Sequence, residues 1–86
     1  MPNIKSAAKR LRQSNRIRER NRAEKSRITR TSAKLSAALE RKDKEECKQI
    51  FREYCSLADK AAKRGVVAKN TTNRRKSRLA AKIAAL

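Results

Sequence analysis

The stretch DKEECKQIFREYCSLADKAAKRG, residues 43–65, carries the clearest folding signal in this chain of 86 residues. Asp43 stands three residues before Glu46, which is the spacing of a capping box at a helix N-terminus. Gly65 suits the left-handed position just beyond a helix C-terminus. The apolar residues between them recur at steps of three and four, which places them on one face of a helix; they are Cys47, Ile50, Phe51, Tyr54, Leu57, Ala58, Ala61 and Ala62. The pattern predicts a helix over about 44–64 that buries one face.

Helix-forming residues also dominate both flanks of this stretch, and no alternating strand pattern interrupts them. Upstream we expect a helix over about 4–41, capped by Asn3 or Ser6. Downstream we expect a helix over about 70–86. Three helices with short turns pack up-down-up, so the sequence predicts one all-α domain, 1–86, that forms a three-helix bundle. Its expected core consists of Ile28, Leu35, Leu39, Ile50, Phe51, Tyr54, Leu57, Leu79 and Ile83.

The first half of the upstream helix has almost no apolar residues. Leu11 and Ile17 are nearly alone there, whereas the second half has an apolar face that includes Leu35. A protein core cannot hold a helix that is polar all round, and short polar helices are marginal in water. We therefore expect the segment from about Ser6 to Arg27 to project from the body and to be fixed by a partner.

The charge of the chain identifies the chemistry of that partner. The chain has 26 Lys and Arg against 8 Asp and Glu, a formal net charge of +18. Both ends are strongly basic and the middle is nearly balanced. So much charge repels itself in a compact chain, which predicts a polyanionic partner. An anionic membrane is the weaker candidate, because a membrane-active helix needs large apolar residues opposite its charges and no apolar run reaches the length of a membrane span.

The sequence lacks the residues that common enzymes use. It has no His, no Gly-rich phosphate loop and only two cysteines. Cys47 and Cys55 would lie about 12 Å apart on one helix, too far for a disulfide, and they are too few to hold zinc. We expect no catalytic residue, no metal and no cofactor. Reduced thiols and the lack of a signal-peptide core favour a cytoplasmic location, although an Arg- and Ser-rich start faintly resembles an organellar transit peptide.

RNA is the favoured polyanion. Arg outnumbers Lys in the first basic segment, and its planar fork meets phosphate with two bonds and stacks on bases. Base-specific reading of single strands needs exposed aromatic rings, but Phe51 and Tyr54 both lie on the predicted core face. We expect recognition of the backbone and shape of folded RNA. A basic-zipper DNA binder needs a sustained heptad seam, whereas this chain turns near Asp43 and Gly65.

Three short motifs point to a known family. They are Asn3-Ile4-Lys5-Ser6-Ala7 near the start, Arg20-Asn21-Arg22 with Lys25-Ser26, and Gly65-Val66-Val67-Ala68-Lys69-Asn70 with Arg74-Arg75-Lys76-Ser77-Arg78-Leu79. On these motifs the chain resembles the small-subunit ribosomal protein twenty family of bacteria and plastids over its whole length. It departs from the usual family pattern at Ala68, at Glu24 with Thr29, and at Thr72 with Asn73. The resemblance implies a three-helix bundle whose long first helix enters 16S-type small-subunit ribosomal RNA early in assembly.

The predicted RNA-binding residues come from both arguments. The resemblance carries over to Lys5, Ser6, Arg10, Asn21, Lys25, Ser26, Lys69, Asn70, Arg74, Lys76 and Arg78. The charge pattern adds Lys9, Arg12, Arg16, Arg18, Arg20, Arg22, Arg27 and Arg75. The expected setting is the ribosome, in the cytoplasm or in a plastid stroma, next to other small-subunit components and without an obligate homo-oligomer.

Overall fold

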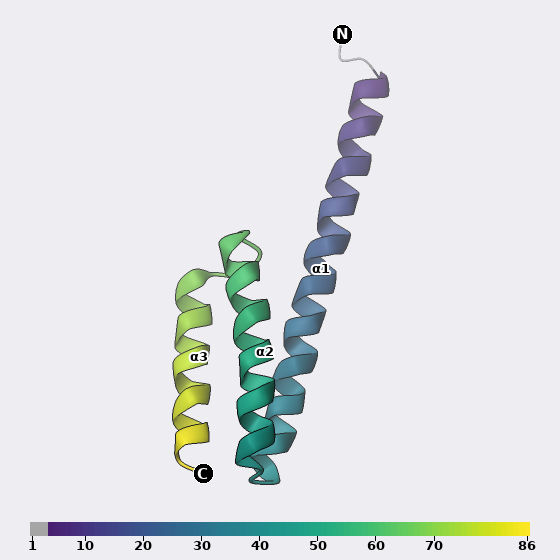
Figure 1. Cartoon of the computed structure of the whole chain (residues 1–86). Coiled ribbons are helices and arrows are strands. Elements are labelled where there is room, and N and C mark those ends of the chain that lie inside the picture. The colour runs from purple at the N-terminus through teal and green to yellow at the C-terminus, as the bar shows by residue number, and fades with distance from the viewer. Residues whose placement is uncertain (1–3) are drawn as a thin grey trace.

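The computed structural model describes residues 4–86, and these form three α-helices: α1 (Ile4–Glu40), α2 (Lys44–Lys63) and α3 (Lys69–Ala84). No strand occurs in this part of the chain. The helices run up-down-up, and α2 lies between α1 and α3 and packs against both (Figure 1). The predicted all-α bundle is therefore confirmed.

The turn between α1 and α2 closes with a left-handed residue. α1 ends at Glu40, one residue before the predicted boundary. Lys42 has φ 57°, its N–H donates to the carbonyl of Leu39 at 3.1 Å, and the N–H of Asp43 donates to that of Ala38 at 3.3 Å. This is a Schellman motif with a Lys where Gly is usual. Because Lys42 has a Cβ, the left-handed conformation lowers the stability of the fold by about 1 kcal/mol or more relative to a glycine at this position.

α2 begins and ends as its sequence signals indicate. The Asp43 side chain accepts a hydrogen bond from the N–H of Glu46 at 3.2 Å. At the other end Gly65 has φ 76°, and the N–H of Val66 donates to the carbonyl of Ala61 at 2.9 Å. This second Schellman motif ends α2 at Lys63, one residue before the predicted boundary.

The outer helix bounds differ slightly from the predicted ones. α3 starts at Lys69, one residue early, and ends at Ala84, two residues before the predicted end. Ser6 lies inside the first turns of α1 rather than at its cap, and Asn3, the alternative cap, lies outside the described residues.

The core consists of two small clusters along α2. Ile28 packs with Tyr54 and two alanines in one cluster, and Leu35 packs with Ile83, Ala38 and Cys47 in the other. Of the predicted core residues, Ile28, Leu35, Tyr54 and Ile83 are buried, whereas Leu39, Ile50, Phe51, Leu57 and Leu79 are only partly buried and pack against the clusters. The core also contains small buried residues outside the expected core set: Thr31, Ala38, Cys47, Ala58, Ala61 and Thr72. Cys47, Ala58 and Ala61 lie on the apolar face predicted for residues 44–64, whereas the two threonines were not predicted. The five partly buried side chains lie at the edges of these clusters, where the packing covers them only in part.

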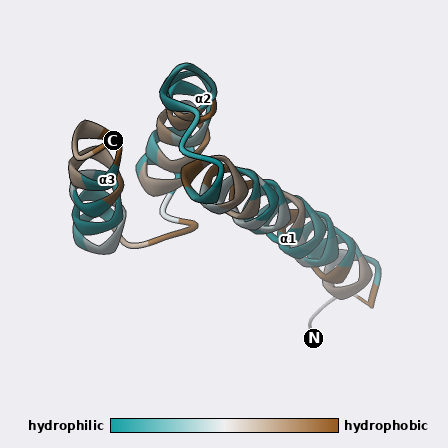
Figure 2. Cartoon of the chain, turned by 90° about the horizontal axis from the view of Figure 1, so that it is seen from below, coloured by the Kyte–Doolittle hydropathy of each residue, from teal (hydrophilic) through white to brown (hydrophobic). Residues whose placement is uncertain are grey.

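The chain is far more extended than a compact domain of its size. Its radius of gyration is 17.5 Å, against about 12 Å for a compact domain of this length. It exposes 7063 Å², whereas a compact monomer of this mass exposes about 5,200 Å². The excess comes from α1, whose N-terminal part extends away from both other helices (Figures 1 and 2).

Candidate nucleic-acid interface

The N-terminal part of α1, residues 4–20, is exposed along its whole length. We call it the basic arm. It carries one acidic residue, Glu19, and seven cations: Lys5, Lys9, Arg10, Arg12, Arg16, Arg18 and Arg20. Its large apolar residues are exposed too: Ile4 by 85%, Leu11 by 62% and Ile17 by 51%. The sequence predicted a projecting segment from about Ser6 to Arg27, but partial burial of α1 begins earlier, at Asn21, and Glu24 already pairs with Arg64 of the body.

One side of α1 is basic from the arm to the body of the protein. Cations recur at three- and four-residue steps, which keeps them on one side of a helix, with a single gap at Ala23. This basic stripe consists of Lys5, Lys9, Arg12, Arg16, Arg20, Arg27, Arg30 and Lys34. Over the body it forms one wall of a shallow groove against Glu53 and Leu57 of α2. Arg30 and Lys34 were missing from the predicted set, although the same spacing, continued for two more steps, would have included them.

The remaining predicted residues of α1 lie on its other sides. Arg10, Arg18, Arg22, Lys25, Ser6 and Ser26 are all exposed. Cations therefore surround the arm rather than forming only one face. A helix with this charge distribution can meet phosphates on several sides at once.

α3 presents a second basic surface. Lys69, Asn70, Arg74, Arg75 and Arg78 are exposed. Helical spacing places Arg74 and Arg78 on the side away from buried Ile83 and Thr72, and Arg75 on the flank of the helix. Lys82 continues this surface one turn beyond Arg78 and was missed by the sequence analysis. α1 and α3 both pack against α2 (Figure 1), so the two basic surfaces belong to separate helices.

Lys76 lies differently from the other predicted cations. Its amine donates to both carboxylate oxygens of Asp59 on α2, at 2.9 and 3.1 Å. This hydrogen bond raises the pKa of Lys76. Lys76 therefore links α3 to α2. To make its predicted RNA contact as well, its amine would have to donate to Asp59 and to an RNA phosphate at the same time.

An ion pair joins the middle of α1 to the end of α2. Glu24 accepts a hydrogen bond from Arg64, the C-cap of α2. Its side chain is only 18% exposed, and its second carboxylate oxygen is buried without a hydrogen-bond partner. The pair links α1 to the C-terminal end of α2 near the point where α1 leaves the bundle.

Within residues 4–86 no three His, Cys, Asp or Glu side chains gather where they could hold a metal ion. None of the three described helices is long and apolar enough to cross a membrane. Both cysteines are free thiols, and burial raises the pKa of the Cys55 thiol. The basic surfaces are thus the chemical feature that distinguishes this protein.

Comparison with known proteins identifies a family. A relative from Thermosipho africanus, named small ribosomal subunit protein bS20, is 50% identical over 96% of this chain and 91% of its own length. Relatives of the same name from Clostridium beijerinckii and Desulfatibacillum aliphaticivorans are 46% and 43% identical, over 96% and 100% of this chain and 95% and 98% of their own lengths. The family described as ribosomal protein S20 matches residues 2–84. The chain therefore belongs to the ribosomal protein S20 family.

Proposed function

We infer that this chain is a structural protein of the small ribosomal subunit that binds 16S-type ribosomal RNA directly. It contacts phosphates and the shape of the folded RNA rather than a base sequence, and it stabilises that fold during assembly. The predicted residues on α1 and α3 form the contact surface, extended by Arg30, Lys34 and Lys82. The family is one of ribosomal proteins, so the prediction that the chain is not an enzyme is confirmed.

The basic arm is the observation that carries this proposal. It has seven cations in 17 residues and nothing to pack against in the bundle. Such a helix is poorly stabilised in water, and its self-repulsion is relieved only by counterions. RNA helices on several sides would supply phosphate to every face of the arm. Release of condensed counterions would then drive association.

The relatives support the cellular setting. Those compared above are named as proteins of the small ribosomal subunit. We infer the same setting here, on a ribosome in the cytoplasm or a plastid stroma, with other small-subunit components nearby and no obligate homo-oligomer. A membrane is disfavoured because Leu11 and Ile17 are the only large apolar side chains between residues 5 and 20.

Competition binding tests the proposal. The purified chain should bind small-subunit ribosomal RNA far more tightly than an equal mass of duplex DNA at physiological salt. The preference should persist when salt is raised, although both affinities fall. Equal affinity for the two nucleic acids would contradict the proposal and favour a DNA-binding role. A stable dimer in solution would point the same way.

A further inference from the structure

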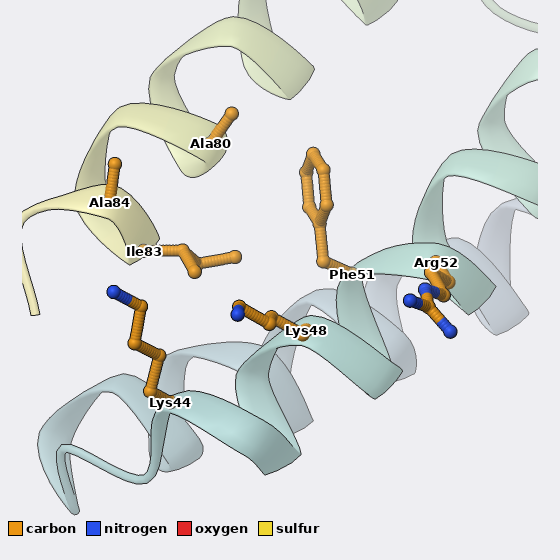
Figure 3. A pocket seen from close by; sticks show the side chains of 7 residues that line it. All are labelled: Lys44, Lys48, Phe51, Arg52, Ala80, Ile83 and Ala84. Atoms are coloured by element: carbon orange, nitrogen blue, oxygen red, sulfur yellow. The ribbon is translucent and has the colours of Figure 1, made fainter.

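A groove between α2 and α3 lies apart from both basic surfaces. It has a volume of about 400 Å³ and is lined by Lys44, Lys48, Phe51, Arg52, Ala80, Ile83 and Ala84. Phe51 and Ile83 point into the gap between the two helices, and the amine of Lys44 extends toward the last turn of α3 (Figure 3). None of these lining residues belongs to the predicted RNA-binding set.

The groove combines an apolar floor with a cationic rim. Phe51 is only partly buried, so part of its ring faces the groove. Lys44, Lys48 and Arg52 are exposed and stand four residues apart along α2, which gives a row of cations with about 6 Å of rise per step. No acidic side chain is among the lining residues. The site therefore suits a ligand with a flat apolar part and a negative charge beside it.

We propose that this groove holds one unpaired nucleotide of the bound RNA, with the base against Phe51 and its phosphates on Lys44, Lys48 and Arg52. The inference rests on the proposed RNA-binding function and adds a site that reads RNA structure. A paired base has neighbours on both faces and cannot reach the ring, whereas an extruded base can stack on an aromatic side chain.

A partner helix fits the groove less well. Helix-in-groove recognition uses anchors from i to i+7, which are about 10.5 Å apart along the helix axis. The apolar wall from Ala80 to Ala84 spans only five residues of α3, a rise of about 6 Å. That length holds one flat group rather than a row of side chains. The three cations on the rim also favour phosphate.

The single Phe of the chain makes the site directly observable. The ring protons of Phe51 should shift when the full chain is titrated with adenosine 5′-monophosphate. They should stay in place with ribose 5-phosphate, which carries the same phosphate without a base. Equal shifts with both compounds, or none with either, would overturn the proposal. A larger shift with an acidic amphipathic peptide would overturn it in favour of a protein partner.

RNA hairpins extend the test to a macromolecular ligand. A hairpin with one bulged adenosine should bind more tightly than the same hairpin without the bulge. Phe51→Leu should reduce this preference by about fivefold or more, and Lys48→Gln should reduce it as well. Lys60→Gln removes an equal charge from another part of α2 and should leave the preference unchanged. Because Lys48 is exposed, its variant keeps the test valid if Phe51→Leu fails to fold.

Different results would refute the groove proposal and the proposed RNA-binding function. If the chain binds small-subunit ribosomal RNA tightly but the bulge preference survives both substitutions, the groove inference is wrong and the proposed function stands. If the chain fails to prefer ribosomal RNA over duplex DNA, the proposed function itself is wrong.

Discussion

Removing two cations from the basic arm should change the salt dependence of RNA binding by a calculable amount. Arg12 and Arg16 are both exposed, four residues apart on the basic stripe. Each phosphate contact adds about 0.7 to 0.9 to the slope of log affinity against log salt. The double substitution Arg12→Gln and Arg16→Gln should therefore lower the magnitude of the slope by about 1.4–1.8. If variant and wild type bind equally at 1 M salt, this change in slope corresponds to a loss of roughly 15- to 30-fold in affinity at 0.15 M salt.

Filter binding or fluorescence anisotropy from 50 to 400 mM salt would measure this slope. Gln retains nearly the helix propensity of Arg, so the arm keeps its tendency to form a helix. Lys60→Gln with Lys63→Gln is the matched control, because both residues are exposed on α2 outside the proposed surfaces. An unchanged slope in the arm variant would refute the reasoning. An equal loss in the control would show that only net charge matters.

Three further predictions concern the free protein. Leu35→Ala should lower the free energy of unfolding in urea by about 2–5 kcal/mol, because Leu35 is 0% exposed. Leu11→Ala, at an exposed site, should change it little. Equal losses of stability in the two variants would contradict the core described above. Amides of residues 4–20 should exchange fast and those of α2 slowly, with the arm becoming protected once RNA binds; equal protection without RNA would contradict the projecting arm. Because Asp59 raises the pKa of Lys76, this pair should stabilise the fold at pH values below the ordinary pKa of Lys, and the stabilisation should be lost as pH rises through the raised pKa. An Asp59→Asn variant lacks the pair, so its free energy of unfolding should fall less over that rise in pH than that of the wild type. An equal fall in both proteins would contradict the prediction.

Local signals in the sequence were sufficient to place the helices. Asp43 and Gly65 bound α2 because each satisfies backbone groups that any helix leaves unpaired. The turn at Lys42 was located only approximately, since a Lys with positive φ has no sequence signature. The small errors at helix ends arise because fraying and capping decide the last residue.

The core was harder to predict than the helices. The spacing of apolar residues placed Phe51, Leu57, Ala58 and Ala61 on one face of α2. The two alanines are buried, whereas Phe51 and Leu57 are only partly buried. Small residues allow α2 to approach its neighbours closely. How close the helices come depends on how all three cross, and the spacing of residues along one helix does not predict that crossing.

The sequence by itself determined the helical class, the net charge and the unsupported arm, because these follow from composition and period along one chain. Only the tertiary structure decided which charges stay available. It pairs Lys76 with Asp59 and Arg64 with Glu24, and it leaves part of the Phe51 ring at the surface of a basic groove. These outcomes depend on which residues of different helices meet, and packing sets such distances rather than the order of residues along any single helix.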